Sequence, residues 1–303
     1  MNEDQKDLVF IVSGGRTGTQ FLGDQLSLVI PNSYSEHEPD ILSLHKPRTI
    51  KRIETFGLRH TFWGKFFGRG GVRAIGTWRI LGKITEQECI RRLQNVRHRY
   101  HSSIEAPLII ESNPQWHYAC DELSITWPHA RIIIIVRDPR TWIRSWLNKG
   151  IRWRAYDLVQ WLPPGRITPK KAGDIEWIKP WKKFDAFSRL AWEWRFVYRR
   201  LARFAQKNAN AKIFRFEDLF HNKDQTPMRE LVEFAATHPK RQYSYQLPRD
   251  FTAKSKNASQ GPAQDWKEWC PEQARLVDSL CGTLMTKFGY GHETSWKAKL
   301  KAS

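Results

Sequence analysis

The sequence contains few cysteines, and they are widely spaced. Its 303 residues include only Cys89, Cys120, Cys270 and Cys281, with no C-x-x-C pair. In a chain of this length, that pattern favours reduced thiols in a cytoplasmic setting over a disulfide framework. No group of cysteines and histidines has the spacing of metal ligands, so we expect no metal site.

Long apolar stretches are also missing. No run approaches the 18 consecutive apolar residues of a membrane-spanning helix, and residues 1–7 are too polar for a signal peptide. We therefore expect a cytoplasmic protein without a transmembrane segment, with at most peripheral membrane contact. A hydrophobic content of 40% is enough to bury a full core. We expect residues 1–303 to form one domain.

Acidic residues are scarce relative to basic ones. The chain has 31 Asp and Glu against 50 Lys and Arg, which gives a formal net charge of +19. Such a field attracts polyanions, including nucleic acid, anionic lipid and sulfated or phosphorylated metabolites. The 15 tryptophans are unusually many. Their flat faces can stack on sugars, bases or cations, although we expect most of them to serve in core and lid packing.

Short, wholly apolar runs recur along the chain and predict buried strands. The first is residues 8–12, which end in Ser13-Gly14-Gly15 and are followed by a helical pattern. Further strands are predicted at 108–110, 132–136 and 213–216, with another around 34–38, and helices at about 184–208 and 271–288. Alternating buried strands and helices indicate an α/β fold with a parallel β-sheet flanked by helices.

Two segments differ in character from these units. Residues 46–101 are rich in Lys, Arg, His, Gly and aromatics, whereas residues 150–183 carry several prolines and four tryptophans. We expect both to be insertions, one basic and one Trp-rich. They would lie over the carboxyl edge of the sheet, where open α/β folds bind their ligands.

The first motif lies between the first predicted strand and its helix, at residues 13–20 (SGGRTGTQ). Glycines let the backbone fold around a phosphate, and the free N–H groups at a helix start attract anions. Arg16 adds a fixed charge, and Thr17 and Thr19 add hydroxyl groups. A Walker A loop needs Lys after its last Gly, but Thr19 occupies that position. The simpler alternative is an ordinary strand-to-helix turn.

The second motif follows the strand at 132–136. Arg137 stands where this strand emerges, Pro139 breaks the chain direction, and the next helix carries Ser145 back toward the strand end. An Arg and a Ser placed in this way can hold one phosphate through charge-assisted hydrogen bonds. The alternative is a surface ion pair between Arg137 and Asp138, with Ser145 on an exposed helix.

Together these motifs resemble the sulfotransferase superfamily. Residues 16–19 (RTGT) are similar to its 5′-phosphosulfate loop, and residues 136–140 (VRDPR) with Ser145 and Trp146 to its 3′-phosphate motif. Residues 216–219 (FEDL) resemble a third signature, and the resemblance spans about 8–220. It implies a P-loop-like fold and transfer of a sulfuryl group from 3′-phosphoadenosine 5′-phosphosulfate to a hydroxyl acceptor, without a metal.

The resemblance also implies roles for individual residues. Arg16 would stabilise the charge that develops on the bridging oxygen, by the electrostatic logic of phosphoryl transfer. Arg137 and Ser145 would hold the 3′-phosphate. Glu217 and Asp218 would orient neighbouring donors. The cofactor-binding set that it implies is Gly14, Gly15, Arg16, Thr17, Gly18, Thr19, Gln20, Arg137 and Ser145.

A base must take the proton of the acceptor hydroxyl. The candidates lie in residues 35–39 (SEHEP), because family members use a Glu or a His in this region. In an extended chain Glu36 and Glu38 share a face and His37 points the opposite way. Pro39 should hold Glu38 in a non-helical conformation. We rank Glu38 first, His37 second and Glu36 third; the alternative is a solvated acidic loop.

The acceptor class follows from charge and tryptophan content. The basic surplus and the Trp-bearing segment 150–183 predict a carbohydrate or glycolipid acceptor, since aromatic faces suit sugar rings and Lys and Arg suit acidic groups. Small phenols or alcohols stay open as alternative acceptors, because the same tryptophans could line an apolar pocket. Two other functions stay open. One is a P-loop kinase of a small hydroxylated substrate, although the Walker Lys and a magnesium-binding Asp are missing. The other is a basic nucleic-acid-binding protein, suggested by the charge of +19.

Overall fold

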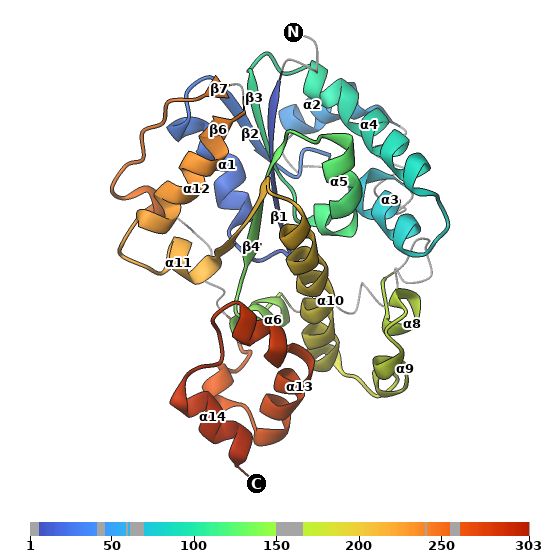
Figure 1. Ribbon diagram of the computed structural model, residues 1–303, viewed down its shortest axis with the longest axis vertical. Coiled ribbons are helices and arrows are strands. Elements are labelled where there is room, and N and C mark those ends of the chain that lie inside the picture. The colour runs from blue at the N-terminus through green and yellow to red at the C-terminus, as the bar shows by residue number, and fades with distance from the viewer. Residues whose placement is uncertain are drawn as a thin grey trace.

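The computed structural model describes residues 6–40, 46–58, 60, 70–149, 166–239, 241–254 and 261–302. A central parallel sheet has helices on both faces, and the last helices of the chain lie beyond the carboxyl ends of the strands (Figure 1). The predicted α/β architecture is confirmed.

Five parallel strands form the central sheet in the order β2-β3-β1-β4-β5. After β1 the chain first builds one side of the sheet, and it returns to the other side with β4. In open α/β sheets, ligands bind at such a switch point, outside the carboxyl ends of the strands. The strands are β1 Asp7–Ser13, β2 Ser33–His37, β3 Leu108–Ser112, β4 Arg131–Val136 and β5 Ala211–Arg215.

The sheet is buried on both faces, because its inner strands are apolar at consecutive positions. In β1, Val9 and Ile11 face one hydrophobic core, whereas Phe10 and Val12 face the other. All four side chains are almost completely buried. This is the pattern expected of a parallel strand covered by helices on both sides.

One face of the sheet is covered by α1 and α12, and the other by α4, α5 and α10 (Figure 1). A small antiparallel pair, β6 and β7, adjoins α12. The elements of the first face are α1 Thr19–Val29, α11 Phe216–Phe220, α12 Thr226–Ala236, β6 Thr237–His238 and β7 Arg241–Gln242. Those of the second face are α4 Glu86–Ser102, the 3-10 helix η3 Pro114–Tyr118, α5 Cys120–Thr126 and α10 Ala186–Lys207.

Of the remaining helices, α2 lies beside α4, and most of the others lie around the carboxyl edge and the C-terminus (Figure 1). Helix α6 follows β4, and α13 packs against α10 and α14. Their bounds are α2 Lys46–Phe56, α3 Gly71–Ile80, α6 Pro139–Leu147, α8 Pro169–Ala172, α9 Ile175–Trp181, η4 Phe251–Lys254, η5 Trp266–Glu268, α13 Pro271–Lys287 and α14 Thr294–Lys301.

The segment 46–101 consists largely of helices α2, α3 and α4. Helix α4 belongs to the crossover between β2 and β3, because Cys89 and Leu93 are buried in the same core as Phe10. Its periodicity is weak in the sequence since Arg97 and His101 also lie on the buried side. The α4 part of the expected insertion therefore belongs to the sheet's own helical cover.

Only 166–183 of the second segment, 150–183, is described; Trp153 and Trp161 lie outside the described residues. Trp177 and Trp181, in α9, pack against neighbouring aromatic side chains. The ring of Trp181 lies 5.2 Å from that of Trp192 in α10, and Trp177 lies 5.9 Å from Phe184. These two tryptophans therefore serve in packing.

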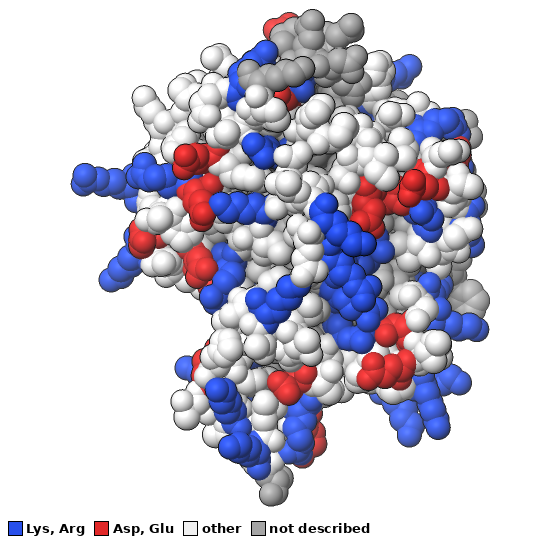
Figure 2. Space-filling model, viewed as in Figure 1, with Lys and Arg blue, Asp and Glu red and all other residues white. Residues whose placement is uncertain are grey.

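Part of the basic surplus is concentrated on one face of the molecule. Figure 2 shows Lys and Arg gathered in the middle of one face, over α10. Arg199 of this helix has Arg195 and Arg203 as charged neighbours, and Asp174 pairs with both Arg195 and Arg199. Across the described ranges, no helix is long and apolar enough to cross a membrane.

Candidate active site

A cavity of about 640 Å³ lies at the carboxyl end of the sheet. It is formed by the loop after β1, the end of β2, α3, η3, α6, α10 and α11. Most of the residues predicted from the sequence line this one cavity. They are Gly14, Gly15, Arg16, Thr17, Gly18, Thr19, Gln20, His37, Glu38 and Arg137.

The loop between β1 and α1 has an unusual backbone. Gly15, Arg16 and Gly18 have φ values of 77°, 57° and 74°, in the left-handed region that favours glycine. A Cβ atom at Gly18 would lie only 2.4 Å from the ring of Phe220. Arg16 has no such freedom, and a non-glycine residue held at positive φ costs about 1–3 kcal/mol. Strain of this kind clusters at functional sites.

Two large side chains from α6 and α10 fix the loop by its backbone. The Trp142 indole N–H donates to the carbonyl oxygen of Gly15 at 2.8 Å. The Tyr198 hydroxyl accepts from the Gly14 N–H at 3.2 Å and donates to the carbonyl of Ile135 in β4 at 3.0 Å. The loop is therefore shaped before any ligand binds.

The structure brings together Arg16, Arg137 and Ser145, which the two motifs place far apart in the chain. Arg16 Nε donates to Ser145 Oγ at 3.0 Å, and Arg137 Nη1 donates to the Arg16 carbonyl at 2.8 Å. Ser145 itself is buried behind the cavity lining. Burial lowers the pKa of Arg137, and the nearby Arg16 charge adds to this effect. Two cations held this close favour an anionic ligand.

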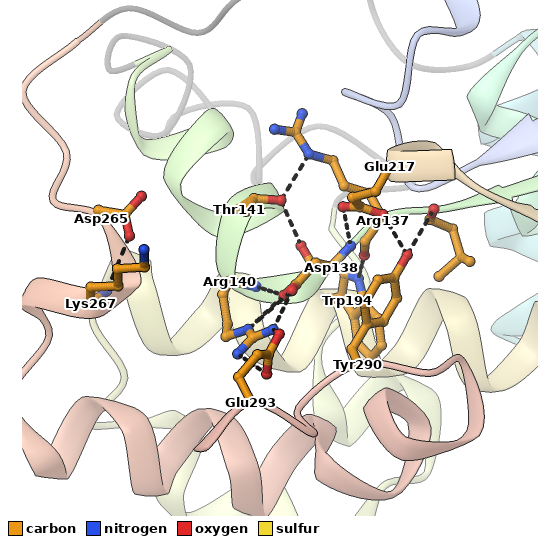
Figure 3. Close-up of polar contacts among 11 residues, drawn as sticks. Arg137, Asp138, Arg140, Thr141, Trp194, Glu217, Asp265, Lys267, Tyr290 and Glu293 are labelled. Atoms are coloured by element: carbon orange, nitrogen blue, oxygen red, sulfur yellow. Dashed lines mark hydrogen bonds and ion pairs between the residues drawn. The ribbon is translucent and has the colours of Figure 1, made fainter. Parts of the chain in front are cut away.

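Arg137 is held on several sides. Its Nε donates to Thr141 Oγ1 at 3.1 Å, and its guanidinium lies 4.4 Å from the centre of the Phe216 ring. The Trp194 indole N–H donates to its carbonyl oxygen at 2.9 Å, so both backbone and side chain have fixed directions (Figure 3).

The neighbouring carboxylates organise the backbone of this motif. Asp138 caps α6 by accepting from the Arg140 N–H at 2.9 Å. Glu217 accepts from the Asp138 N–H at 3.1 Å and from the Tyr290 hydroxyl at 2.7 Å (Figure 3). Burial raises the pKa of Glu217, although the Tyr290 hydrogen bond opposes that rise.

Arg140 is directed away from the cavity and toward the C-terminal helices. Its guanidinium pairs with Asp138 and Glu293 (Figure 3). It also lies 4.4 Å and 5.0 Å from the rings of Trp266 and Trp296. Arg140 therefore fastens α14 to the start of α6.

His37 and Glu38 form the opposite wall of the cavity. The Glu38 N–H donates to the carbonyl of Ser112 at 2.9 Å, which extends the pairing of β2 with β3 by one residue. The strand predicted around 34–38 is present as β2, but it ends at His37, and the φ of Glu38 is 45°, in the left-handed region rather than the extended one. Because the chain turns there, both His37 and Glu38 line the cavity, and their side chains approach to 3.9 Å.

Glu36 does not line the cavity with Glu38, contrary to the expected alternation. Its carboxylate accepts from the hydroxyls of Tyr34 at 2.8 Å and Tyr100 at 3.2 Å, and from Arg52 at 3.1 Å. These contacts give Glu36 a role in joining β2 to α2 and α4.

The sequence did not point to His117, a nearly buried residue of η3 that lines the cavity. Its Nδ1 lies 2.7 Å from the Pro114 carbonyl and 3.1 Å from the Ser13 carbonyl, so Nδ1 carries the proton. Burial lowers its pKa to about 4 and keeps the ring neutral. Nε2 is then an acceptor, and it has no hydrogen-bond partner in the described ranges.

Three further charged residues of the lining, two basic and one acidic, were also missed. Arg73 comes from α3, Lys149 follows α6, and Glu193 belongs to α10. The side chain of Arg166 pairs with Glu193. No local motif marks any of these positions, because each reaches the cavity only through the packing of its helix.

These features define an α/β protein in which a glycine-containing loop after β1 and arginines from two separate motifs meet in one cavity. A model of the sulfotransferase family matches residues 8–161, just over half of the chain. The chain therefore belongs to the sulfotransferase family.

A solved structure shares this fold, and two others are similar to this chain at lower scores. The sulfotransferase STF9 from Mycobacterium avium is 14% identical, with a TM-score of 0.53 over 94% of this chain and 78% of the other. A sulfotransferase from Alicyclobacillus acidocaldarius is 16% identical, with a TM-score of 0.44 over 96% and 98%. The sulfotransferase domain of the Synechococcus PCC 7002 olefin synthase is 15% identical, with a TM-score of 0.45 over 91% and 94%. No curated protein sequence matches the chain.

Proposed function

We propose that this sulfotransferase takes its sulfuryl group from 3′-phosphoadenosine 5′-phosphosulfate and transfers it to a hydroxyl acceptor. One observation carries the proposal. Two anion-binding motifs, 121 positions apart in the chain, meet in one cavity through the contact of Arg137 with the Arg16 carbonyl. Two separate phosphate-binding points suit a nucleotide with phosphates on both its 5′ and 3′ positions.

The residues present fit such a donor. The loop 14–20 offers backbone N–H groups at the start of α1, and Arg16 and Arg137 supply positive charge. Thr17 Oγ1 and Trp146 Nε1 are buried polar atoms at the cavity wall that have no hydrogen-bond partner in the part of the chain that is described. Buried polar groups are normally paired, so these two are open to oxygens of a bound anion.

The chemistry is a group transfer. A bound donor would supply the sulfuryl group: a bond forms between the acceptor oxygen and sulfur, the bond from sulfur to the 5′-phosphate oxygen breaks, and the acceptor proton passes to a base. In our proposal Arg16 stabilises the charge left on the 5′-phosphate, and Arg137 holds the 3′-phosphate. Ser145, predicted to hold the 3′-phosphate with Arg137, lies behind the lining and accepts from Arg16 Nε, so we propose that it supports the site by orienting Arg16. Arg16 stays charged and can only donate hydrogen bonds.

Glu38 remains our first choice for the base, with His37 second. Glu38 lines the cavity, and its positive φ directs the side chain to the same wall as His37. Glu36 is engaged by three donors outside that lining, which lowers its rank further. His117 joins the candidates, because its Nε2 is an acceptor in a neutral ring.

For the acceptor we propose a hydroxyl of a carbohydrate or glycolipid that carries negative charge. The cationic lining supports this class: among the described residues, Arg16, Arg73, Arg137 and Lys149 face the cavity together with two carboxylates, those of Glu38 and Glu193. The tryptophans of α9 no longer support it, since they pack against α10 and Phe184.

The direct test is an acceptor screen with isotopically labelled donor, read by mass spectrometry. We expect label on hydroxylated, acidic glycans or glycolipids. Turnover of simple phenols with none of any glycan would overturn the acceptor class. Tighter binding of ATP with magnesium than of 3′-phosphoadenosine nucleotides would favour a kinase. Binding to arbitrary DNA with steep salt dependence, without sulfuryl transfer, would favour a nucleic-acid-binding protein.

A further inference from the structure

A charged cluster is buried between β3, α4 and the turn after β2, outside the cavity lining. Its centre is Glu111 near the carboxyl end of β3, which is only 1% exposed. The carboxylate accepts from Arg97 Nε and Nη2, each at 2.8 Å, and from the Trp116 indole N–H at 2.9 Å. Arg97 comes from α4 and is completely buried.

The same guanidinium reaches a second carboxylate. Arg97 Nη1 lies 3.5 Å from Asp40 Oδ2, and Asp40 is 4% exposed. His60 Nε2 lies 3.7 Å from the same oxygen. Burial alone lowers the pKa of Arg97, but the charges of Glu111 and Asp40 outweigh burial and raise it. The arginine therefore stays charged and links three elements that are distant in sequence.

Such a cluster is a poor source of stability. Desolvating three charges offsets most of their attraction, and apolar replacements of buried ion pairs are often as stable. Its geometry, however, is specific, because a bidentate Arg–carboxylate pair fixes distance and direction. A role in positioning accounts for the cluster better than a role in stability does.

The segment that the cluster can position is Glu38 to Asp40. Glu38 has a φ of 45° directly before Pro39, and such a conformation persists only where the surrounding structure determines it. On the N-terminal side, the Glu38 N–H is bonded to Ser112 of β3. On the C-terminal side, Asp40 is held through Arg97 to Glu111, also of β3. The strained residue is thus fixed to one strand from both sides.

We propose that Asp40, Arg97 and Glu111 are positioning residues, which hold the Glu38 carboxylate in the conformation that accepts the acceptor's proton. The proposal rests on the proposed function of Glu38 as base. None of the three residues lines the cavity, so their effect on the reaction passes through Glu38.

The test is Asp40→Asn in the full chain, because it keeps shape and leaves the pair of Arg97 and Glu111 intact. We expect kcat to fall by about 10- to 100-fold, the cost of a misplaced catalytic group, with donor affinity and melting temperature almost unchanged. The amide hydrogens of 33–40 should exchange faster. The control is Glu122→Gln, since Glu122 is also a nearly buried carboxylate paired with an arginine, Arg79 at 2.7 Å.

A double-mutant cycle separates positioning from general damage. If Asp40 acts through Glu38, Asp40→Asn combined with Glu38→Gln should be no slower than Glu38→Gln alone. The proposal is overturned if the losses of kcat in the two single variants add fully in the double variant. It is also overturned if Asp40→Asn and Glu122→Gln have the same kcat and the same amide exchange rates. If Asp40→Asn fails to fold, the joint replacement Arg97→Met with Glu111→Leu undergoes the same cycle.

If the proposed function itself is wrong, the measurements give a different result. An enzyme in which Glu38→Gln keeps full kcat contradicts both Glu38 as base and the positioning role, while donor binding stays intact. If the wild-type enzyme binds no 3′-phosphoadenosine nucleotide, the donor proposal is contradicted before any variant is compared.

Discussion

The two ends of the cavity are built by different means. At the end with Arg16 and Arg137, short sequence motifs supply the groups, and side chains from α6 and α10 bind the motif backbone directly, as Trp142, Tyr198 and Trp194 do. At the end with His37 and Glu38, few residues are recognisable from a motif. A buried ion-pair cluster from distant parts of the chain supports the wall.

This difference reflects what each end has to bind in our proposal. A nucleotide with fixed phosphates can be held by a preformed loop and two arginines, and such a site has a local sequence signature. The acceptor end has to place one base and accommodate one particular hydroxyl compound. Long-range packing serves that purpose, so its residues are scattered along the chain.

The largest effect is expected at the acceptor end. Glu38→Gln keeps the size of the side chain but removes its capacity to take a proton. We expect kcat and kcat/KM to fall together by about two to four orders of magnitude, while donor affinity is unchanged. Steady-state kinetics and donor titration measure the two quantities. If His37→Gln or His117→Gln abolishes turnover while Glu38→Gln retains it, an imidazole is the base.

A second prediction concerns the buried imidazole between the two ends. Burial lowers the pKa of His117 to about 4, whereas an unfolded histidine titrates near 6.5. Above pH 6.5 the imidazole is neutral in both the folded and the unfolded state, so its protonation costs the folded state no stability there. As the pH falls from 6.5 to 4, only the unfolded state gains the proton, and about 3 kcal/mol is lost.

Chemical denaturation between pH 4 and 8 measures that loss. His117→Asn keeps a donor for the carbonyls but has no titrating ring, so its free energy of unfolding should depend less on pH in this window. Equal pH dependence of variant and wild type would mean that His117 is not held neutral by burial.

The smallest effect is expected from removing one hydrogen bond to the loop backbone at the donor end of the cavity. Trp142→Phe removes the hydrogen bond to the Gly15 carbonyl and keeps most of the ring. The loss of about 1 kcal/mol should weaken donor binding roughly fivefold. Trp192→Phe is the matched control, because the Trp192 N–H donates to Asp174, outside the cavity lining, at 2.8 Å. Equal losses in both variants would contradict a specific role for Trp142.

Much of the fold could be predicted from the sequence, because its strands are short apolar runs in an otherwise polar chain. The runs at 8–12 and 132–136 lie within β1 and β4, and the pattern at 184–208 exceeds α10 by only a few residues. Helix α4 escaped prediction since its buried face carries Arg97 and His101, which no hydrophobic pattern reveals.

The residues of the candidate site also fall into those that the sequence predicts and those that it does not. The loop and Arg137 are contiguous with strand ends, so topology alone brings them to one edge. Glu38 was found by its place after β2, but its positive φ was not, because the neighbouring contacts, of Glu38 with Ser112 and of Asp40 with Arg97, are long-range. His117 carries no signal of its own: only the two carbonyls facing Nδ1 show that its other nitrogen is an acceptor.

Calorimetric titration of the wild type and Arg137→Ala with adenosine 3′,5′-bisphosphate, adenosine 5′-phosphate and ATP with magnesium tests the central claim most directly. We predict that the wild type prefers the bisphosphate. Arg137→Ala should lose about 2 kcal/mol, or roughly 30-fold, for the bisphosphate alone, because it removes a charge-assisted contact to the 3′-phosphate. Equal losses for both adenosine phosphates, or tighter binding of ATP with magnesium by the wild type, would contradict the account.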